Sequence, residues 1–110
     1  MNIRKAKWWS RALRSGEYKQ CWNVLRESDR KGVYAYCVLG VLQALAESSS
    51  AFHGSIDWDS ACLSPDVMEW AGLHNNFALY AKDEYLSAHS DNGMKFPKLA
   101  TIIDRNIETL

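Results

Sequence analysis

Cys37 is the residue whose type and position best suit chemistry, because a long apolar segment begins directly after it. A cysteine at a helix N-terminus feels the positive end of the helix dipole, which lowers the pKa of the thiol and favours the nucleophilic thiolate. Cysteine hydrolases pair such a thiolate with a histidine from elsewhere in the chain. The side chains available as base and orienting group are His53, His74, His89, Asp91 and Asn92. Their spacing selects no single partner.

A second interpretation of Cys37 is structural. At helical spacing it lies on the same arc as Val41 and Ala44, and free cysteines are among the most buried residues of proteins. This pattern favours a small buried hydrophobe over a nucleophile. The sequence therefore predicts a protein without catalysis, and a Cys37-dependent hydrolase or transferase is the alternative.

Other catalytic and metal-binding patterns are missing. There is no Cys-x-x-Cys and no closely spaced histidine pair, as structural zinc sites use. Asp57 and Asp59 begin like a calcium loop but lack its glycine and closing glutamate. The carboxylates of Asp83 and Glu84 are typical of solvated charges, and no glycine-rich phosphate loop occurs. We therefore expect neither a metal nor a cofactor.

The charges of the chain are segregated, although its formal net charge is zero. Residues 1–31 contain nine basic and three acidic side chains, whereas residues 32–110 contain four basic and ten acidic ones. The first part therefore carries a charge of +6 and the second a charge of −6. This asymmetry predicts a basic surface set against an acidic body, which can orient a charged partner.

Residues 3–14 are predicted to form the helix that carries the basic surface. At about 100° per residue, Ala6, Trp9 and Leu13 fall in one arc that should be buried. Four cations occupy another arc with Trp8 beside them, and Ser15-Gly16 ends the helix. The candidate partner-binding residues are Arg4, Lys7, Trp8, Arg11 and Arg14, extended by Lys19, Arg30 and Lys31.

A β-hairpin and a central helix are predicted to follow. The expected elements are a strand at residues 18–25, a turn at 28–32, a returning strand at 33–36 and a helix at 37–47. This helix is apolar on nearly every side except for a narrow stripe of Gly40, Gln43 and Glu47. Such a helix belongs in the centre of a domain.

The second half is predicted to contain shorter elements after a long irregular segment, residues 48–63. Ser64 at the N-cap and Pro65 at the first helical position begin a helix that stops at Gly72. The remaining expected elements are a strand at 77–81, a helix at 83–89, a turn at 91–93 and a last helix from Pro97. The prediction is one compact α+β domain over residues 1–110, mainly helical, with a β-hairpin between the basic helix and the central buried helix.

Hydropathy and cysteine usage predict a cytoplasmic protein without membrane contact. No segment approaches the roughly 18 apolar residues that a spanning helix needs. The charged start is not followed by the apolar stretch of a signal peptide. The three cysteines, Cys21, Cys37 and Cys62, are odd in number and widely spaced, which disfavours a disulfide framework.

Four segments, taken in order, resemble a group of small, mostly uncharacterised bacteriophage and prophage proteins. They are Trp9-x-x-Ala12-Leu13-x-Ser15-Gly16-x-Tyr18-x-Gln20, Tyr36-Cys37-x-Leu39-Gly40-Val41-Leu42, Leu63-x-Pro65-x-Val67-x-x-Trp70-x-Gly72-Leu73 and Asp91-x-Gly93-x-x-Phe96-x-x-Leu99-Ala100-x-x-Ile103. This chain has Ser90 where such relatives commonly have Asn. The resemblance implies a phage accessory protein that acts in the cytoplasm of the bacterial host cell.

The resemblance and the charge pattern together lead to a functional hypothesis. Small phage accessory proteins often inhibit host or defence machinery, as anti-CRISPR proteins do. We therefore expect a non-catalytic protein that binds and inhibits or modulates a bacterial protein or nucleoprotein complex through its charged surface. One alternative is a direct DNA- or RNA-binding module that uses the basic helix. The acidic part could also mimic nucleic acid, or meet the basic part of a second copy in a homodimer.

Overall fold

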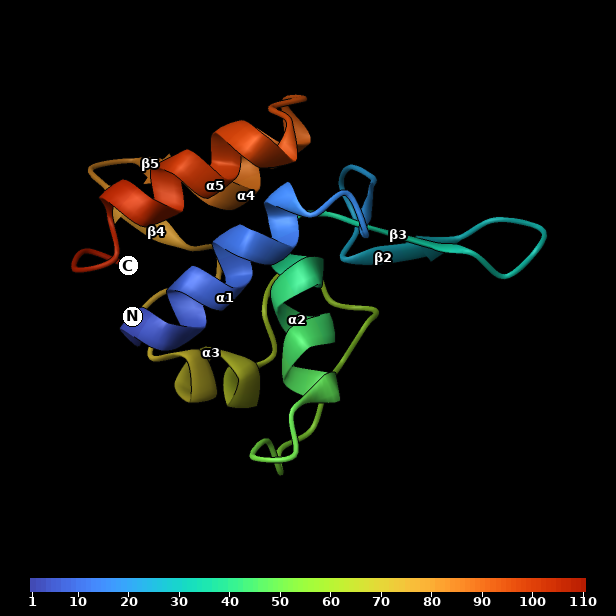
Figure 1. Cartoon of the computed structure of the whole chain (residues 1–110), viewed down its shortest axis with the longest axis horizontal. Coiled ribbons are helices and arrows are strands. Elements are labelled where there is room, and N and C mark those ends of the chain that lie inside the picture. Colours follow the sequence, from blue (N-terminus) through green and yellow to red (C-terminus); the bar gives the residue numbers. More distant parts are fainter.

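Five helices and two small sheets make up the computed structural model, which describes all 110 residues (Figure 1). The helices are α1 (Ile3–Arg14), α2 (Val38–Ser48), α3 (Pro65–Ala71), α4 (Leu86–Asp91) and α5 (Phe96–Arg105). The strands are β1 (Lys19–Gln20), β2 (Arg26–Ser28), β3 (Tyr34–Tyr36), β4 (Leu79–Ala81) and β5 (Glu84–Tyr85). Helix α1 crosses the body between α5 on one side and α2 and α3 on the other, and the β2–β3 hairpin extends away from the helices (Figure 1). The predicted α+β domain, mainly helical, is confirmed.

Helix α1 forms where the sequence predicts it. The Asn2 carboxamide oxygen accepts a hydrogen bond from the backbone N–H of Lys5 at 3.0 Å and caps the first turn. Ala6, Trp9 and Leu13 are all buried, as their shared arc predicts. The chain leaves the helix at Ser15, and Gly16 follows with a φ of 78°. One face of α1 therefore faces the core, and the other is left to solvent.

Helix α2 is the central helix, and it is buried on more sides than its polar stripe indicates. Gly40 packs so closely on the β2 side that an added Cβ would come 1.8 Å from the carbonyl oxygen of Leu25. Gln43 is fully buried, and its polar atoms are satisfied there. Its side chain accepts a hydrogen bond from Ser64 N–H at 2.7 Å and donates one to Asp57 C=O at 3.4 Å. Of the three stripe residues, only Glu47 is exposed. Gln43 thus anchors the irregular segment that follows α2.

The predicted hairpin is present, but the strand predicted over residues 18–25 is wrong. Strand β2 pairs with β3 in antiparallel register, while β1 pairs with the other edge of β3 in parallel. Between β1 and β2, Asn23 adopts a φ of 67°, and its N–H donates to the Asp91 carboxylate at 2.9 Å. A left-handed residue cannot continue a strand. Tertiary contacts have therefore overridden the β-propensity of this segment.

The turn of the hairpin forms where the sequence predicts it. The Asp29 carboxylate accepts hydrogen bonds from the N–H groups of Lys31 and Val33 at 2.8 and 3.0 Å. Gly32 takes a φ of 80°, a conformation that glycine adopts without strain. These backbone hydrogen bonds lower the pKa of the Asp29 carboxyl.

The second half confirms two helix starts, at Pro65 for α3 and at Phe96, one residue before the predicted Pro97, for α5. It corrects one strand and one helix. Helix α3 ends at Ala71, and Gly72 follows it with a φ of 75°. The Ser64 hydroxyl accepts from Asp57 N–H at 2.8 Å, so it holds the preceding loop rather than capping α3. The strand predicted at 77–81 shortens to β4, and β5 pairs with it, so the helix predicted from residue 83 begins only at Leu86.

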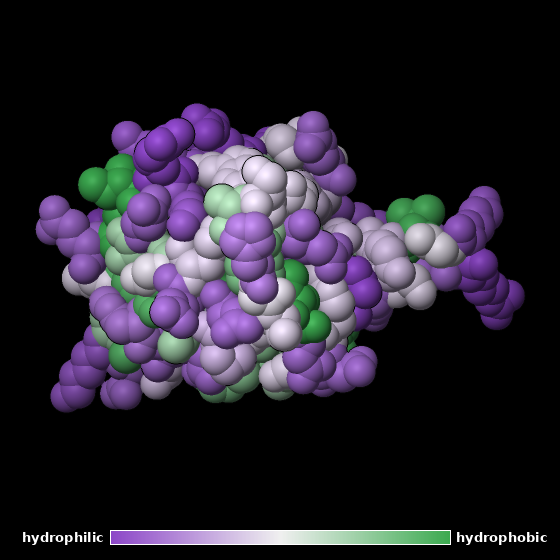
Figure 2. All heavy atoms as spheres, turned by 90° about the horizontal axis from the view of Figure 1, so that it is seen from below, coloured by the Kyte–Doolittle hydropathy of each residue, from purple (hydrophilic) through white to green (hydrophobic).

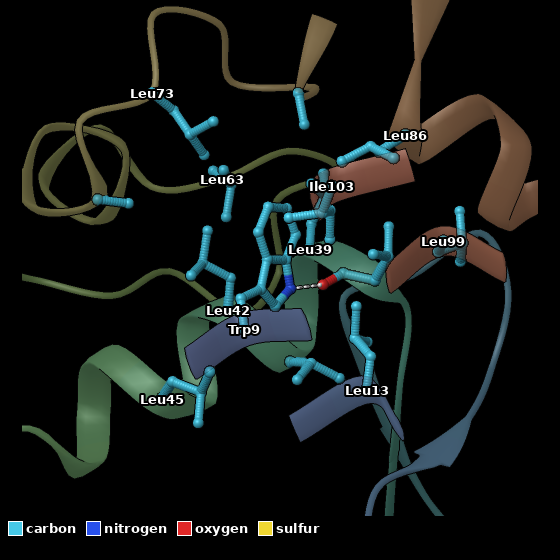
Figure 3. Packing of buried hydrophobic residues seen from close by; sticks show 14 of the residues in the cluster. Trp9, Leu13, Leu39, Leu42, Leu45, Leu63, Leu73, Leu86, Leu99 and Ile103 are labelled. Carbon is cyan, nitrogen blue, oxygen red and sulfur yellow. Dashed lines mark hydrogen bonds between the residues drawn. The ribbon is translucent and has the colours of Figure 1, made fainter. Parts of the chain in front are cut away.

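A single core of 22 buried residues joins the five helices, and Tyr36 of β3 and Tyr80 of β4 pack against it. Trp9 lies at its centre, surrounded by leucines and Ile103 from α2, α4, α5 and the loops (Figure 3). The indole N–H of Trp9 donates to the Val38 carbonyl at 3.0 Å, which fixes α1 against the first turn of α2 (Figure 3). No helix combines the length and the apolar character needed to cross a membrane.

Candidate functional site

The outer face of α1 forms one wall of a hollow of about 770 Å³, which we call the basic groove. The opposite wall comes from α3 and from the loop after α2. The residues that line the groove are Asn2, Arg4, Lys5, Lys7, Trp8, Arg11, Ser49, Ala51 and Trp70. Four of them are cations and none is acidic, so the groove suits an anionic group.

Two tryptophans form the aromatic part of the basic groove. Trp8 of α1 and Trp70 of α3 meet edge to face, with ring centroids 6.1 Å apart. Phe52, from the loop after α2, meets Trp70 in the same way at 6.0 Å. The Trp70 indole N–H is buried without a hydrogen-bond partner, and it is the only buried side-chain polar atom left so. The aromatic pair joins α1 to α3 and gives the groove an apolar wall.

Lys5 holds the two walls together. Its ammonium group donates to the Trp70 carbonyl at 2.6 Å and lies 4.5 Å from the centre of the Trp70 ring. A carbonyl and a ring face stabilise the cation without neutralising it. Lys5 therefore adds a fixed positive charge to the groove.

The other three groove cations form no close ion pair, although Lys7 is near enough to Asp104 to help lower the pKa of that carboxyl. The structure contains two ion pairs within 4.0 Å, Arg14–Asp104 and His89–Glu84, and neither involves Arg4, Lys7 or Arg11. All three side chains are exposed. Their charges are therefore available to a ligand.

Arg14 belongs to a different environment from the other predicted cations of α1. Its guanidinium donates to the Asp104 carboxylate at 2.6 Å and to the Thr101 hydroxyl at 3.3 Å, both on α5. Although partial burial of Asp104 acts in the opposite direction, the nearby Ser10 hydroxyl and Arg14 guanidinium lower the pKa of its carboxyl. Arg14 thus fastens α1 to α5 and does not line the groove.

Lys19, Arg30 and Lys31 do not extend the basic groove. Arg30 and Lys31 lie in the turn of the β2–β3 hairpin, which points away from the helices (Figure 1). Lys19 lies on β1, which joins the same sheet. The predicted basic surface is therefore divided between the groove on α1 and the sheet.

The hairpin carries its own stack of aromatic and cationic side chains. The Arg26 guanidinium lies 4.1 Å from the ring centre of Tyr34 and also 4.1 Å from that of Trp58. Tyr36 contacts Tyr34 and Trp58 with centroid distances of 6.3 and 6.0 Å. Because Arg26 is enclosed by rings, it fixes the base of the hairpin to the loop that contains Trp58.

Cys37 has the environment of a core residue. It is 6% exposed at the N-cap of α2, and burial raises the pKa of its thiol. A raised pKa disfavours the thiolate that a nucleophile needs. The candidate histidines make other contacts or are exposed: His89 contacts Tyr80 and Glu84, His74 contacts a backbone carbonyl, and His53 lies in an exposed loop. None forms a hydrogen bond with Cys37.

No cluster of three or more His, Cys, Asp or Glu side chains is arranged to hold a metal ion. Asp91 binds the backbone of Asn23, and Ser90 is buried with its hydroxyl accepting from Val38 N–H at 3.4 Å. These late-turn residues therefore hold the segment after β1 and the start of α2.

Sequence reasoning missed Lys5 on α1 and the whole wall of the groove opposite α1. Lys5 was on neither arc of the predicted basic helix, and Trp70 was assigned only to a short helix. Ser49 and Ala51 lie in a segment without periodicity. Only the long-range packing of α3 and this loop on α1 brings them together.

A second, smaller hollow adjoins the basic groove, and we call it the acidic hollow. Its volume is about 410 Å³, and it is lined by Ala51, Phe52, His53, Gly54, Asp66, Glu69 and Trp70. It contains two carboxylates and neither lysine nor arginine. Trp70 and Ala51 line both hollows, so the two opposite charges lie next to each other.

Residues 1–107 match the protein family described as Domain of unknown function (DUF8296), and the chain belongs to this family. No curated protein and no solved structure matches the chain. The family description names no activity.

Proposed function

We propose that this member of the family is a non-catalytic binding protein that receives an acidic surface of a macromolecular partner in its basic groove. The observation that carries the proposal is the set of three unpaired cations, Arg4, Lys7 and Arg11, around a hollow walled by two tryptophans. Exposed cations without internal partners contribute little to folding. Their value lies in attracting a charged partner.

The groove offers two kinds of contact. The cations steer an acidic partner and set its orientation, which affects the association rate more than the final affinity. Trp8 and Trp70 supply the apolar contact that slows dissociation, since tryptophans dominate many interfaces. Because α1 is fixed to the core by Trp9, the surface is rigid and loses little entropy on binding. Binding would act by occluding the partner's own ligand site.

The partner that we propose is a bacterial host or defence protein or nucleoprotein complex. This part of the proposal is supported by the resemblance of four sequence segments to small phage and prophage proteins. A phage accessory role, inhibition of the complex and a location in the cytoplasm of the host cell belong to the same proposal.

Affinity capture from bacterial cells tests the proposal. The test variant carries Arg4→Glu, Lys7→Glu and Arg11→Glu, and the matched control carries Lys82→Glu, Lys98→Glu and Arg105→Glu, which changes the net charge equally. We expect the wild-type chain and the control to retain the same partner and the test variant to lose it. Retention by a folded test variant would refute the role of the groove.

Direct binding of DNA or RNA is the second candidate function, because the same cations and rings suit phosphates and stacked bases. Filter binding over a salt series separates the two candidates. Nucleic-acid binding predicts a steep loss of affinity as salt rises, with a slope set by the number of phosphate contacts. Absence of binding at low salt removes this candidate.

We propose no chemistry for Cys37, because it is buried and its thiol pKa is raised. Cys37→Ser should therefore leave partner capture unchanged in a folded protein. A complete loss of function with unchanged stability would instead support the Cys37-dependent hydrolase or transferase.

A further inference from the structure

The basic groove and the acidic hollow adjoin each other and form one continuous face, with a positively charged region beside a negatively charged one. Figure 2 views the molecule from the side of α3 and the loop after α2, where hydrophilic side chains cover most of the surface and hydrophobic atoms show only in small patches. The groove places Arg4, Lys7 and Arg11 on one side of Trp70, and the acidic hollow places Asp66 and Glu69 on the other. The border between the charges is therefore Trp70, together with Ala51.

Two adjacent patches of opposite charge are complementary to a copy of themselves. In a two-fold dimer the same surface is used by both subunits, so that residue i meets residue j and residue j meets residue i. A two-fold axis at the border near Trp70 would set the cations of each copy against the carboxylates of the other. Both contacts would form at once, and no like charges would be opposed.

We infer that this face is a self-recognition surface, and that a second copy of the chain docks there with α3 packed against α3. The self-contact uses Arg4, Lys7 and Arg11 of each copy against Asp66 and Glu69 of the other. Trp70 lies at the centre of the contact.

The carboxylates are placed to serve this contact. Asp66 and Glu69 are three residues apart on α3 and therefore lie on one face of the helix. Both are exposed, and neither forms an ion pair within its own chain. One oxygen of Asp66 accepts from Ser55 N–H at 2.7 Å, which orients the carboxylate. The Glu69 carboxylate has no hydrogen-bond partner in the chain.

Self-recognition would regulate the basic groove. While two copies are paired, the groove of each is covered by the carboxylates of the other, and an acidic partner must displace them. This masking rests on the proposed function, whereas the self-contact itself rests only on the charges of the face. The contact consists largely of exposed ion pairs, so it should be moderate in strength and sensitive to salt.

Sedimentation equilibrium of the wild-type chain is the first test. At about 50 mM salt we expect a concentration-dependent dimer that dissociates as salt is raised, because screening weakens exposed ion pairs. A chain that stays monomeric at low salt and at the highest attainable concentration would overturn the inference.

Mixing two charge-reversed variants tests the arrangement itself. In the Arg11→Glu homodimer, both contacts place the new glutamate at position 11 against the Asp66 and Glu69 carboxylates of the other copy. In the Glu69→Arg homodimer, both contacts place the new arginine at position 69 against the groove cations of the other copy. We expect each variant alone to dimerise at least about tenfold more weakly than the wild type. In the mixed heterodimer, Glu at position 11 faces Arg at position 69 in one contact, and Arg11 faces Glu69 in the other. Mixing should therefore restore the dimer.

Restoration on mixing cannot arise from misfolded chains, and circular dichroism with thermal unfolding confirms that each variant folds. Lys98→Glu, which lies outside both hollows, is the matched control and should dimerise like the wild type. A wild-type dimer that neither reversal weakens, or variants that fail to associate when mixed, would contradict this arrangement. Dimerisation is measured on the chain alone, without any partner, so the self-contact and the proposed function can fail separately.

Discussion

Helices α1 and α2 differ in how they divide their surface between the core and solvent. Helix α1 buries Ala6, Trp9 and Leu13 and exposes its cations to the basic groove. Helix α2 is buried on almost every side, including at Gly40 and Gln43, and becomes exposed only in its last turn, at Glu47. Cys37 lies at the N-cap of α2, and the candidate contact residues Arg4, Lys7, Trp8 and Arg11 lie on α1.

This difference separates a helix that supports the fold, α2, from a helix whose outer face we propose contacts a partner, α1. A helix that is buried all round can be altered only by disturbing the core, so α2 is suited to holding other elements in place. An amphipathic helix can change its outer face freely while its inner face keeps it fixed. The comparison predicts that changes in α2 act on stability and that changes on the outer face of α1 act on binding.

The two neighbouring tryptophans of α1 should show the largest contrast. Trp9→Ala removes the central core side chain and its hydrogen bond to Val38, and should cost about 3–5 kcal/mol of unfolding free energy. Trp8→Ala, on a half-buried ring at the groove, should cost less than half as much and should weaken partner capture. Urea unfolding of both variants measures the difference. Equal losses of stability would contradict the division of α1 into two faces.

Gly40→Ala should be the next most damaging change. The added Cβ would meet the Leu25 carbonyl at 1.8 Å, so α2 and the segment before β2 would have to separate. Overpacking of this kind costs about 1–3 kcal/mol or more. Thermal unfolding provides the measurement, with Ala44→Gly as the control, which should cost about 1 kcal/mol from helix propensity alone. A neutral Gly40→Ala would show that the two elements are not tightly packed.

Alkaline pH should weaken the core through its thiols. Burial raises the pKa of Cys37 and raises that of Cys21 from 9.0 to about 12. The folded state therefore holds these protons more tightly than the unfolded state, and the stabilisation present below pH 9.0 is lost as pH rises towards 12. Chemical unfolding between these values should show a falling free energy. In a Cys21→Ala, Cys37→Ala variant the fall should be shallower, and an identical slope would exclude the thiols as its cause.

The Arg14–Asp104 pair should have the smallest effect. Both side chains are partly exposed, and such pairs contribute less than about 1 kcal/mol. A double-mutant cycle with Arg14→Ala and Asp104→Ala should give a coupling energy within this limit. The lowered pKa of Asp104 adds stability above its unfolded value of 3.8 that disappears as pH falls below it. A coupling of several kcal/mol would mean that the pair is more central to the fold than its exposure indicates.

The two helices were predictable because their signals are local. The arc of Ala6, Trp9 and Leu13 and the continuous apolar run of α2 each determine what one helix must bury. The start at Pro65 and the stop at Gly72 rest on backbone geometry that these residue types prefer.

The groove and the strand register were not predictable because they depend on distant residues. The backbone of Asn23 is held by Asp91, which the propensities of residues 18–25 cannot reveal. Trp70 meets Trp8, and Arg14 meets Asp104, across 62 and 90 residues of chain. The sequence identified Arg4, Lys7, Trp8 and Arg11 as one face, but it contained no signal for the opposite wall or for the separation of Lys19, Arg30 and Lys31 from that face.

Oxidative footprinting of tryptophans in the captured complex tests the central claim most directly. Trp8 and Trp70 line the basic groove, whereas Trp22 is 41% exposed elsewhere on the surface. If the groove receives the partner, oxidation of Trp8 and Trp70 should fall on binding while that of Trp22 stays the same, relative to the free monomer. Protection of Trp22 with Trp8 and Trp70 unchanged would place the contact on another face and contradict the account.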